Sequence, residues 1–388
     1  MTPMNIPITK PILGEEEAAA AREAILSGWV TQGPQVAAFE EEFAHYVGAN
    51  HACAVSSCTT ALHLALHALG IRSGDEVITV SHSFIATANA VRYCGATPVF
   101  VDIDAITYNM DPALVEAAIT PRTKAIMPVH QVGLPCDMPG LMRIARQHDL
   151  PVIEDAACAI GSEIHIDDRW ERMGKPHGTV ACFSFHPRKV ITTGDGGMLT
   201  TNDSSLDRRF RLLRQHAMSI PDTVRHAAKT VIFEEYPEVG FNYRMTDIQA
   251  AVGRVQLRRL PEILSPRFEL ARRYDEALRN IPGMVPPFVP SDVKANYQSY
   301  AVRLTPEFPL SRDELMQALL ERGINTRRGI MNAHQEKAYA DQQPAGLPCS
   351  EAARDQTILL PLYSSMTAAE QQYVVDQLRV LASVRKAG

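Results

Sequence analysis

Residues 181–201 (ACFSFHPRKVITTGDGGMLTT) combine an apolar run, a lysine and a glycine-rich turn in a pattern that suits chemistry at a carbonyl group. The apolar run ends at Ser184, Lys189 follows in a loop, and three glycines form the turn before the next apolar run. In a partly dry pocket, desolvation would lower the pKa of this lysine and free its neutral amine as a nucleophile. From this segment alone, an exposed loop lysine is the main alternative, because most lysines are exposed.

Two adjacent carboxylates end another apolar run, in residues 152–161 (VIEDAACAIG). Open α/β sheets bind ligands at the carboxyl ends of their strands, which is where this run places Glu154 and Asp155. A buried aspartate requires a partner. The protonated nitrogen of a pyridine ring would serve, and an aspartate there makes pyridoxal phosphate (PLP) a better electron sink. Capping of a helix by Asp155 is the alternative.

Two further segments carry polar groups next to expected helices. Residues 56–60 (SSCTT) lie at a strand-to-helix junction, where backbone N–H groups and hydroxyls can bind an anion. Residues 240–247 (GFNYRMTD) precede a long helix that Thr246 or Asp247 can cap, which leaves Asn242 and Arg244 as available polar groups. Simple helix capping explains the first segment as well, and a plain loop explains the second.

The elements that must position these residues alternate between short apolar runs and helices. The expected strands are residues 51–56, 76–80, 97–102, 124–129, 151–154, 180–183 and 197–200, and the expected helices among them are residues 59–69, 85–93 and 138–148. This alternation is typical of an α/β fold with a mainly parallel central sheet and helices on both faces.

The second part of the chain no longer alternates between short strands and helices. Residues 246–260 and 270–278 are expected to be helical, and a proline-rich passage follows at residues 282–290. After it we expect a strand at residues 299–304 and helices at residues 312–322 and 368–384. A chain of 388 residues exceeds one typical core. We therefore predict a large PLP-binding domain with an N-terminal arm over residues 1–255 and a small C-terminal α+β domain over residues 256–388.

Composition excludes several classes of protein. The net charge of −6 does not give the basic face expected of a nucleic-acid-binding protein. The sequence contains neither a long apolar run nor a leader pattern, so we predict no membrane association. The seven cysteines show no CxxC spacing and suggest neither a disulfide framework nor a metal site. We therefore expect a cytoplasmic enzyme.

Taken together, these motifs resemble those of the DegT/DnrJ/EryC1/StrS sugar aminotransferases, within fold-type I of the PLP enzymes. The resemblance covers nearly the whole chain in family order. It rests on GWVTQGP at residue 28, TANAV at 87, PVFVDID at 98, MPVHQVGLPCDM at 127, VIEDAACAIG at 152, FSFHPRKVITTGDGGMLTT at 183, GFNYRMTDIQAAVGRVQL at 240 and ILLPLYSSMT at 358.

The resemblance implies roles around the cofactor ring. Lys189 would bind PLP as a Schiff base and carry the proton of the 1,3-shift. Asp155 would pair with the pyridine nitrogen, and Phe84 would stack on the ring. Family members that replace this lysine with histidine act as dehydratases, so Lys189 favours amino transfer. Family members commonly have His or Gln at the position of Cys158, where the side chain touches the cofactor hydroxyl. Cysteine is a poor substitute for that contact.

The resemblance also implies a phosphate site and a partner subunit. Cys58, through its backbone N–H, would hold the phosphate together with Thr59 and Ser184. The family commonly has Gly or Ala at position 58, and a backbone contact survives that difference. Asn242 is similar to the residue that reaches the phosphate of the neighbouring subunit. It therefore implies a homodimer with shared sites.

The implied reaction takes an amino group from a donor, glutamate by resemblance, and passes it to a ketone. The expected acceptor is a keto sugar carried on a nucleotide. Arg327 and Arg328 could contact an anionic part of it, because arginine suits phosphate and carboxylate geometry. Weaker substrate candidates are His186, Arg244 and His334. The alternatives are an aminotransferase of a cyclitol or other non-nucleotide ketone, a PLP-dependent sugar dehydratase and a catalytically silent PLP-fold regulator. A nicotinamide-dependent dehydrogenase would need a GxGxxG turn in another context.

Overall fold

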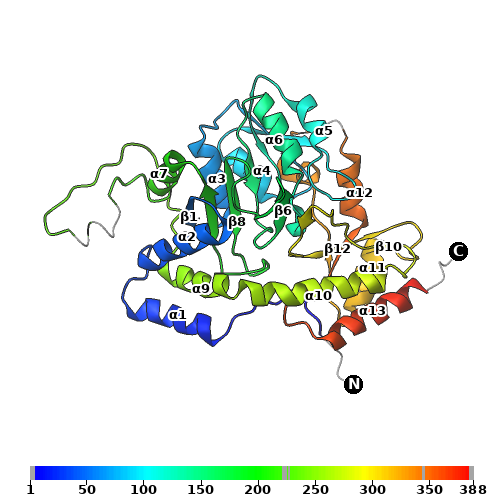
Figure 1. The fold of residues 1–388 in the computed structure, drawn as a ribbon. Coiled ribbons are helices and arrows are strands. Elements are labelled where there is room, and N and C mark those ends of the chain that lie inside the picture. Colours follow the sequence, from blue (N-terminus) through cyan, green and yellow to red (C-terminus); the bar gives the residue numbers. More distant parts are fainter. Residues whose placement is uncertain (1–4, 221–224, 226–227, 343–345, 384–388) are drawn as a thin grey trace.

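The computed structural model describes residues 5–220, 225, 228–342 and 346–383 (Figure 1). Its central sheet joins two hydrogen-bonded groups of strands, β3-β2-β4 and β5-β8-β9-β1, through parallel bridges from Ile126 to Val152 and from Val129 to Asp155. The strands are β1 (His51–Val55), β2 (Glu76–Val80), β3 (Thr97–Val101), β4 (Thr123–Met127), β5 (Ile153–Asp155), β8 (Val180–Ser184) and β9 (Gly197–Thr201). β9 pairs antiparallel with β1 and β8, and the other pairings are parallel. The predicted mainly parallel sheet is confirmed.

Successive side chains of each strand point to opposite faces of this sheet, and both faces are buried. In β1, Ala52 and Ala54 join a core that includes Phe39 and Leu141, whereas Cys53 and Val55 join a second core against other helices. The helices of this part are α1 (Glu15–Leu26), α2 (Pro34–Val47), α3 (Cys58–Ala68), α4 (Ala86–Tyr93), α5 (Pro112–Val115), α6 (Met138–Gln147), α7 (Ser204–Leu213) and α9 (Asp247–Arg258). Helices cover both faces, as expected for apolar strands of this kind.

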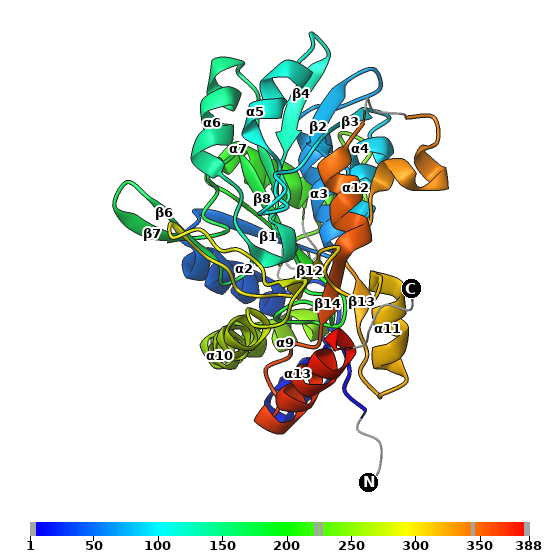
Figure 2. The ribbon, with the colours of Figure 1, turned by 90° about the vertical axis from the view of Figure 1, so that its right-hand side faces the viewer.

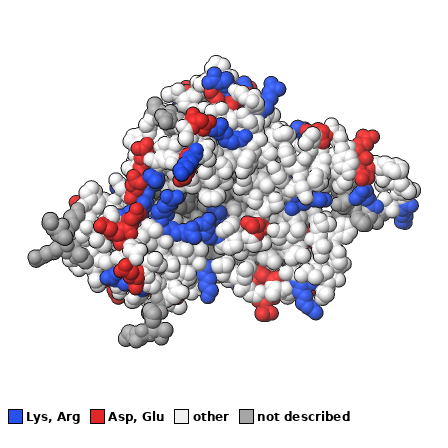
Figure 3. Space-filling model, turned by 180° about the vertical axis from the view of Figure 1, so that it is seen from behind, with Lys and Arg blue, Asp and Glu red and all other residues white. Residues whose placement is uncertain are grey.

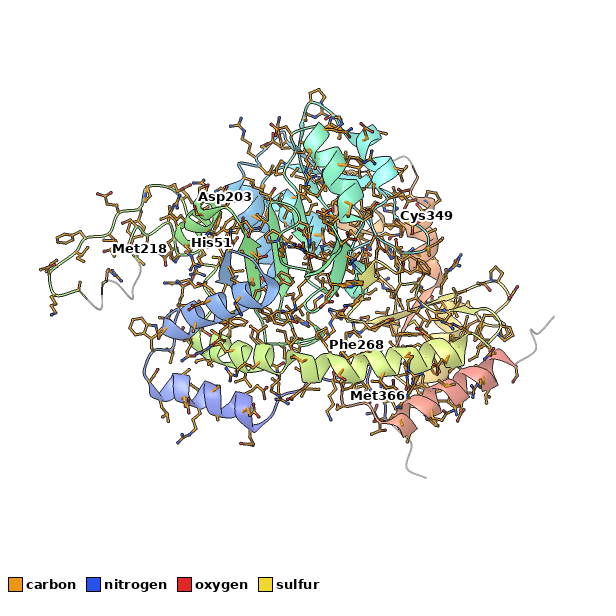
Figure 4. The ribbon with its side chains drawn as sticks, viewed as in Figure 1. His51, Asp203, Met218, Phe268, Cys349 and Met366 are labelled. Carbon is orange, nitrogen blue, oxygen red and sulfur yellow. The ribbon has the colours of Figure 1, made fainter. Side chains whose placement is uncertain are left out.

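The later part of the chain forms a separate core around a small antiparallel sheet of order β10-β12-β14-β13. Its strands are β10 (Met284–Val285), β12 (Tyr300–Leu304), β13 (Arg327–Arg328) and β14 (Thr357–Leu360), and its helices are α10 (Leu260–Leu278), α11 (Arg312–Leu320) and α13 (Ala368–Ala382). Helix α12 (Pro348–Gln356) also belongs to the later part of the chain, but its Ala353 packs into the first core. Met366, a member of this core, lies near α10 and α13 (Figure 4). The N-terminal Ile6 also belongs to it and bridges Ile324.

Helix α10 runs across the lower part of the molecule, just above α13, and connects the two parts (Figure 1). Ile263 and Leu264 pack into the first core, and Leu270 and Tyr274 into the second. The division into domains at residues 255 and 256 stays a prediction, with α10 shared between the two cores. We expected helix only from residue 270 onward, but α10 begins at Leu260 and continues through Pro266. Burial of its apolar face compensates for the hydrogen bond that proline removes.

Several elements were not predicted from the sequence, among them helix α2 and one hairpin. Helix α2 packs its buried phenylalanines against the sheet. The strands β6 (Glu163–Ile166) and β7 (Arg169–Arg172) form a hairpin that pairs with β11 (Val293–Lys294). Figure 2 shows this hairpin and α11 on opposite sides of the molecule. Within the described residues, no helix combines the length and apolar character needed to cross a bilayer.

Candidate active site

Lys189 lies in a loop that is fixed at both ends by its own backbone and threonine side chains. The Lys189 N–H donates to the carbonyl of His186 at 2.8 Å. The Thr192 hydroxyl donates to the carbonyl of Phe185 at 2.7 Å, and accepts from the N–H of Gly194 at 3.0 Å. The amine of Lys189 donates to the sulfur of Cys158 at 3.1 Å. The loop therefore holds the lysine at the carboxyl end of β8, as the motif predicted.

The protonation of Lys189 differs from the expectation. Burial lowers the pKa of this amine, but Cys158, Cys58 and Asp155 act in the opposite direction and together raise the pKa above its ordinary value. The expectation of a lowered pKa was wrong because it considered desolvation and left out the neighbouring sulfurs and carboxylate. The same interactions place these groups around one amine, so Lys189, Asp155, Cys58 and Cys158 come together as predicted from their motifs.

Asp155 is a buried carboxylate with neutral hydrogen-bond donors. It is 4% exposed, accepts from the Thr87 hydroxyl at 2.7 Å, and accepts from the N–H of Ala157 at 3.2 Å. Burial raises its pKa, although these two bonds and the charge of Lys189 act against the rise. A carboxylate in this environment is costly to ionise and would be stabilised by a further cation.

The neighbouring Glu154 has a different environment. It accepts from His130 Nε2 at 3.1 Å and from the N–H of Gly178 at 2.7 Å. Burial opposes ionisation of Glu154, but the bonds from His130 and Gly178 together with the charge of His177 hold its pKa below the usual range. Of the two adjacent carboxylates, only Asp155 thus lacks strong local compensation.

The N-terminus of α3 lies beside this pocket. Ser57 caps the helix by accepting from the N–H of Thr60 at 3.2 Å, which leaves the backbone N–H groups of Cys58 and Thr59 without a protein acceptor among the described residues. The Cys58 sulfur donates to the carbonyl of Cys182 at 3.6 Å, so its side chain turns into the core. Only its backbone N–H is available to an anion, and the helix dipole favours negative charge there.

Three more residues belong to the segments that surround Lys189 and Asp155: Gly197, Ser184 and Phe84. A side chain at Gly197 would stand 2.4 Å from the Ser57 carbonyl carbon, so glycine is required for β9 to approach the start of α3. Ser184 ends β8, and its hydroxyl accepts from the N–H of His186 at 3.4 Å. Phe84 is 63% exposed although it is a large apolar side chain. Its carbonyl accepts from the N–H of Thr87, the residue that bonds Asp155.

The remaining candidates are more distant or have other partners. Asn242 is exposed and accepts from Arg244 Nε at 3.2 Å. His334 Nδ1 lies 2.6 Å from the Ser81 hydroxyl, and its Nε2 lies 3.3 Å from Glu351, which is a structural arrangement. Burial lowers the pKa of His186.

Arg327 and Arg328 form the short strand β13 and are exposed. No acidic side chain pairs with either within the part of the chain that the structure describes. Burial and the charge of Arg327 lower the pKa of Arg188, the residue before Lys189.

The comparisons with known proteins identify the family of the chain. A model of the DegT/DnrJ/EryC1/StrS aminotransferase family matches residues 11–379. The chain belongs to this family. The spore coat polysaccharide biosynthesis protein SpsC of Bacillus subtilis is 40% identical to this family member over 379 residues, which are 96% of each chain.

Solved structures of relatives share the fold. Structure superposition with DesI, determined in the presence of its TDP-sugar product, gives a TM-score of 0.87 at 31% identity and covers 98% of this chain and 93% of that one. The Spr1654 protein of Streptococcus pneumoniae in its PLP-form gives a TM-score of 0.89 at 27% identity over 98% and 99% of the two chains. This family member is therefore a PLP-dependent aminotransferase with the fold-type I architecture.

The donor set of the family member fits PLP on chemical grounds. The primary amine matches the aldehyde of PLP, and the buried carboxylate without strong compensation matches the pyridine nitrogen. The helix N-terminus with free N–H groups matches the phosphate, and the exposed phenyl ring matches the flat ring of the cofactor. These groups come from the 183–201 segment, β5, α3 and the turn before α4.

Three further residues were missed by sequence reasoning. Thr87 bonds Asp155, Arg188 is influenced by the charge of Arg327, and Asn296 bonds the carbonyls of Cys158 and Ile160 at 2.7 and 2.8 Å. Thr87 lies inside the TANAV motif and Arg188 beside Lys189, so their positions carried a signal. Asn296 is distant in the chain and stands in a loop without a recognisable pattern, so no local signal could have identified it.

Proposed function

We propose that this chain transfers an amino group from glutamate to a keto sugar carried on a nucleotide, using PLP bound by Lys189 and Asp155. The observation that carries the proposal is the buried Asp155 carboxylate, which has only a hydroxyl and a backbone N–H as hydrogen-bond donors and lies close to the charge of Lys189. When bound, PLP supplies an electron sink that stabilises negative charge developing at the substrate carbon.

Asp155 would hold a proton on the pyridine nitrogen, and Thr87 would keep the carboxylate in position for that contact. Burial favours this pairing, because little water is present to solvate the carboxylate in place of the pyridine nitrogen. Lys189 would bind the aldehyde through its amine and, once released, would carry a proton between the cofactor's C4′ atom and the substrate carbon. The hydrogen bonds that fix its loop would return the amine to the same place.

The start of α3 would bind the phosphate. The N–H groups of Cys58 and Thr59 supply donors, Ser184 adds a hydroxyl, and the helix dipole adds positive potential. Phe84 would cover the flat face of the ring, which accounts for a large apolar side chain left 63% exposed in the chain alone.

The acceptor would bind toward β13, where Arg327 and Arg328 are exposed and Arg188 lies close to Arg327. Guanidinium groups without acidic partners suit a phosphate or diphosphate. Figure 3 shows Lys and Arg side chains gathered near the middle of one face of the molecule, with acidic groups beside them. The likeness to DesI, whose structure was determined with its TDP-sugar product, supports a nucleotide-linked sugar as acceptor.

The active protein would be a homodimer in which Asn242 reaches the phosphate site of the partner. Asn242 is exposed here, and the described part of the segment between α7 and α9 extends from the body of the molecule (Figure 1). That segment exposes apolar side chains at Val231, Phe233 and Val239, each more than 80% accessible. Such a patch is typical of an interface.

We place the protein in the cytoplasm. The seven cysteines are all free, which suits a reducing compartment.

A two-step assay tests the proposal. The PLP-loaded protein is mixed with glutamate, and its absorbance near 400–430 nm should fall by about the full amplitude as the cofactor takes up the amino group. The product is then incubated with a panel of nucleotide-linked keto sugars and with free cyclitol ketones. Recovery of the band with a nucleotide sugar supports the proposal. Recovery only with a free ketone, or elimination of water without amino transfer, would contradict it.

A further inference from the structure

The sulfur of Cys158 occupies a place next to Lys189 that the reaction described above does not use. It is the hydrogen-bond acceptor of the Lys189 amine, at 3.1 Å, among the described residues. The other nearby thiol, Cys58, directs its sulfur to the carbonyl of Cys182. The carboxylate of Asp155 is engaged by Thr87 and Ala157. Cys158 is therefore the group in position to orient this amine.

The backbone of Cys158 is held in place by hydrogen bonds from Asn296, a residue distant in the chain. The side chain of Asn296, which is fully buried, donates to the carbonyls of Cys158 and Ile160. The Asn296 N–H in turn donates to the Ser162 hydroxyl at 3.1 Å. Gly133 completes the packing, because a side chain there would stand 1.8 Å from Asn296 Oδ1. The sulfur is thus presented to Lys189 by a rigid support from the later part of the chain.

We propose that Cys158 is a positioning residue for Lys189, whose sulfur accepts a hydrogen bond from the amine whenever that amine is not covalently bound. The inference rests on the proposed function, in which Lys189 is released and recaptured in every cycle. A buried amine without a partner would pay a desolvation penalty and lose its orientation. Sulfur is a weak acceptor, so the amine leaves it at little cost when it returns to the aldehyde.

The charged and titratable groups facing Lys189 come from several elements. Cys58 lies at the start of α3, Asp155 at the end of β5, Cys158 in the loop after β5, and His186 in the loop of Lys189 itself. Cys58, Cys158 and Asp155 favour the protonated amine, whereas burial opposes it. Removal of the Cys158 contact should therefore lower the pKa of Lys189 and increase the share of neutral amine at a given pH.

The test uses the full-length protein after removal of its cofactor. The rate at which an amine-selective acylating reagent modifies Lys189 is followed by peptide mass spectrometry from pH 6 to about 11, spanning the ordinary range for lysine. We expect Cys158→Ala to shift the midpoint of this profile to lower pH and to increase labelling several-fold near pH 8. Cys158→Ser should give a midpoint between those of the wild type and Cys158→Ala, because its hydroxyl can accept the same bond but carries no charge.

The matched control is Cys94→Ala, since Cys94 is half-buried at the end of α4 and makes no contact with Lys189. A Cys158→Ala midpoint equal to those of the wild type and the control overturns the proposal. A Cys158→Ser profile shifted as far as that of Cys158→Ala also overturns it, because the hydrogen bond would then not be the cause. The proposed function is tested separately by borohydride reduction of the PLP-loaded wild type, which must fix the cofactor on Lys189.

Discussion

The pocket around Lys189 and the edge at β13 differ in how completely the protein prepares them. In the pocket, Lys189, Asp155 and Cys158 already have hydrogen-bond partners within the chain, and each partner is fixed by a neighbouring element. At the edge, Arg327 and Arg328 are exposed and pair with no acid within the described ranges. The cofactor side of the site is therefore preorganised, whereas the arginines on the proposed acceptor side would gain their partners from the ligand.

The physical reason lies in hydration. Ionising Asp155 in a dry pocket is costly, and the bonds from Thr87 and Ala157 with the charge of Lys189 offset that cost only in part. An exposed guanidinium keeps its water and costs little to leave without a partner. Variants in the pocket should therefore affect the chemical step, whereas variants at the edge should affect binding of the acceptor.

The sharpest test of this contrast is Lys189→Ala. Because this amine attaches the cofactor and carries the proton, we expect kcat to fall by at least about a thousandfold. Lys294→Ala is the control, since Lys294 is an exposed lysine that lies on the Trp170 ring, 4.0 Å from its centroid. Multiple turnovers at the wild-type rate in Lys189→Ala would contradict the role of Lys189 as the cofactor-binding amine and proton carrier.

Asp155→Asn should reduce kcat by about a hundredfold or more, because a neutral amide cannot hold the pyridine nitrogen protonated. Burial raises the pKa of Asp155 in the folded protein above its value in the unfolded chain. The cofactor-free protein therefore loses stability as the pH rises through the folded-state pKa, because the unfolded chain ionises this group more easily. The cofactor-free variant should therefore have a Tm about 2–4 °C above the wild type at pH 7–8 and no advantage at pH 4.

The thermal measurement uses the cofactor-free wild type and Asp341→Asn as references, because Asp341 is an exposed aspartate paired with Arg92. A Tm below the wild type at pH 7–8 would mean that the Asp155 carboxylate stabilises the folded chain without its cofactor. The contrast between a costly pocket and an inexpensive edge would then be wrong.

At the edge, Arg327→Ala should raise KM for the acceptor by about tenfold to a hundredfold and leave the glutamate half-reaction unchanged, since loss of one charged hydrogen bond is worth about 1.5–3 kcal/mol. Arg272→Ala provides an exposed arginine on α10 as the control. A fall in the glutamate rate with an unchanged acceptor KM would place Arg327 in the pocket rather than at the edge.

The smallest expected effect is that of Thr87→Val, which keeps the shape of the side chain and removes the bond to Asp155. We expect kcat to fall by about threefold to tenfold, as for loss of one buried hydrogen bond. Thr87→Ser should restore most of the activity because it retains the hydroxyl. If both variants match the wild type, the carboxylate does not depend on this residue for its orientation.

Local patterns were sufficient to predict most of the large part of the chain. The strand runs and helices around Lys189 and Asp155 lie within a few residues of their expected bounds. Helix α2 and the β6–β7 hairpin were not predicted, and α10 is longer than expected. These elements depend on packing against distant parts of the chain, which a local pattern does not contain.

By itself, the sequence determined the chemical groups and the order of the elements that carry them: an amine at 189, a carboxylate at 155, and strand ends that present them at one edge of a sheet. Only the tertiary structure decided the partners of these groups. Thr87 on Asp155, Asn296 behind Cys158 and the raised pKa of Lys189 all arise where segments distant in the sequence meet. Burial and charge act through space, so the strength and protonation of each group follow from the fold rather than from neighbours along the chain.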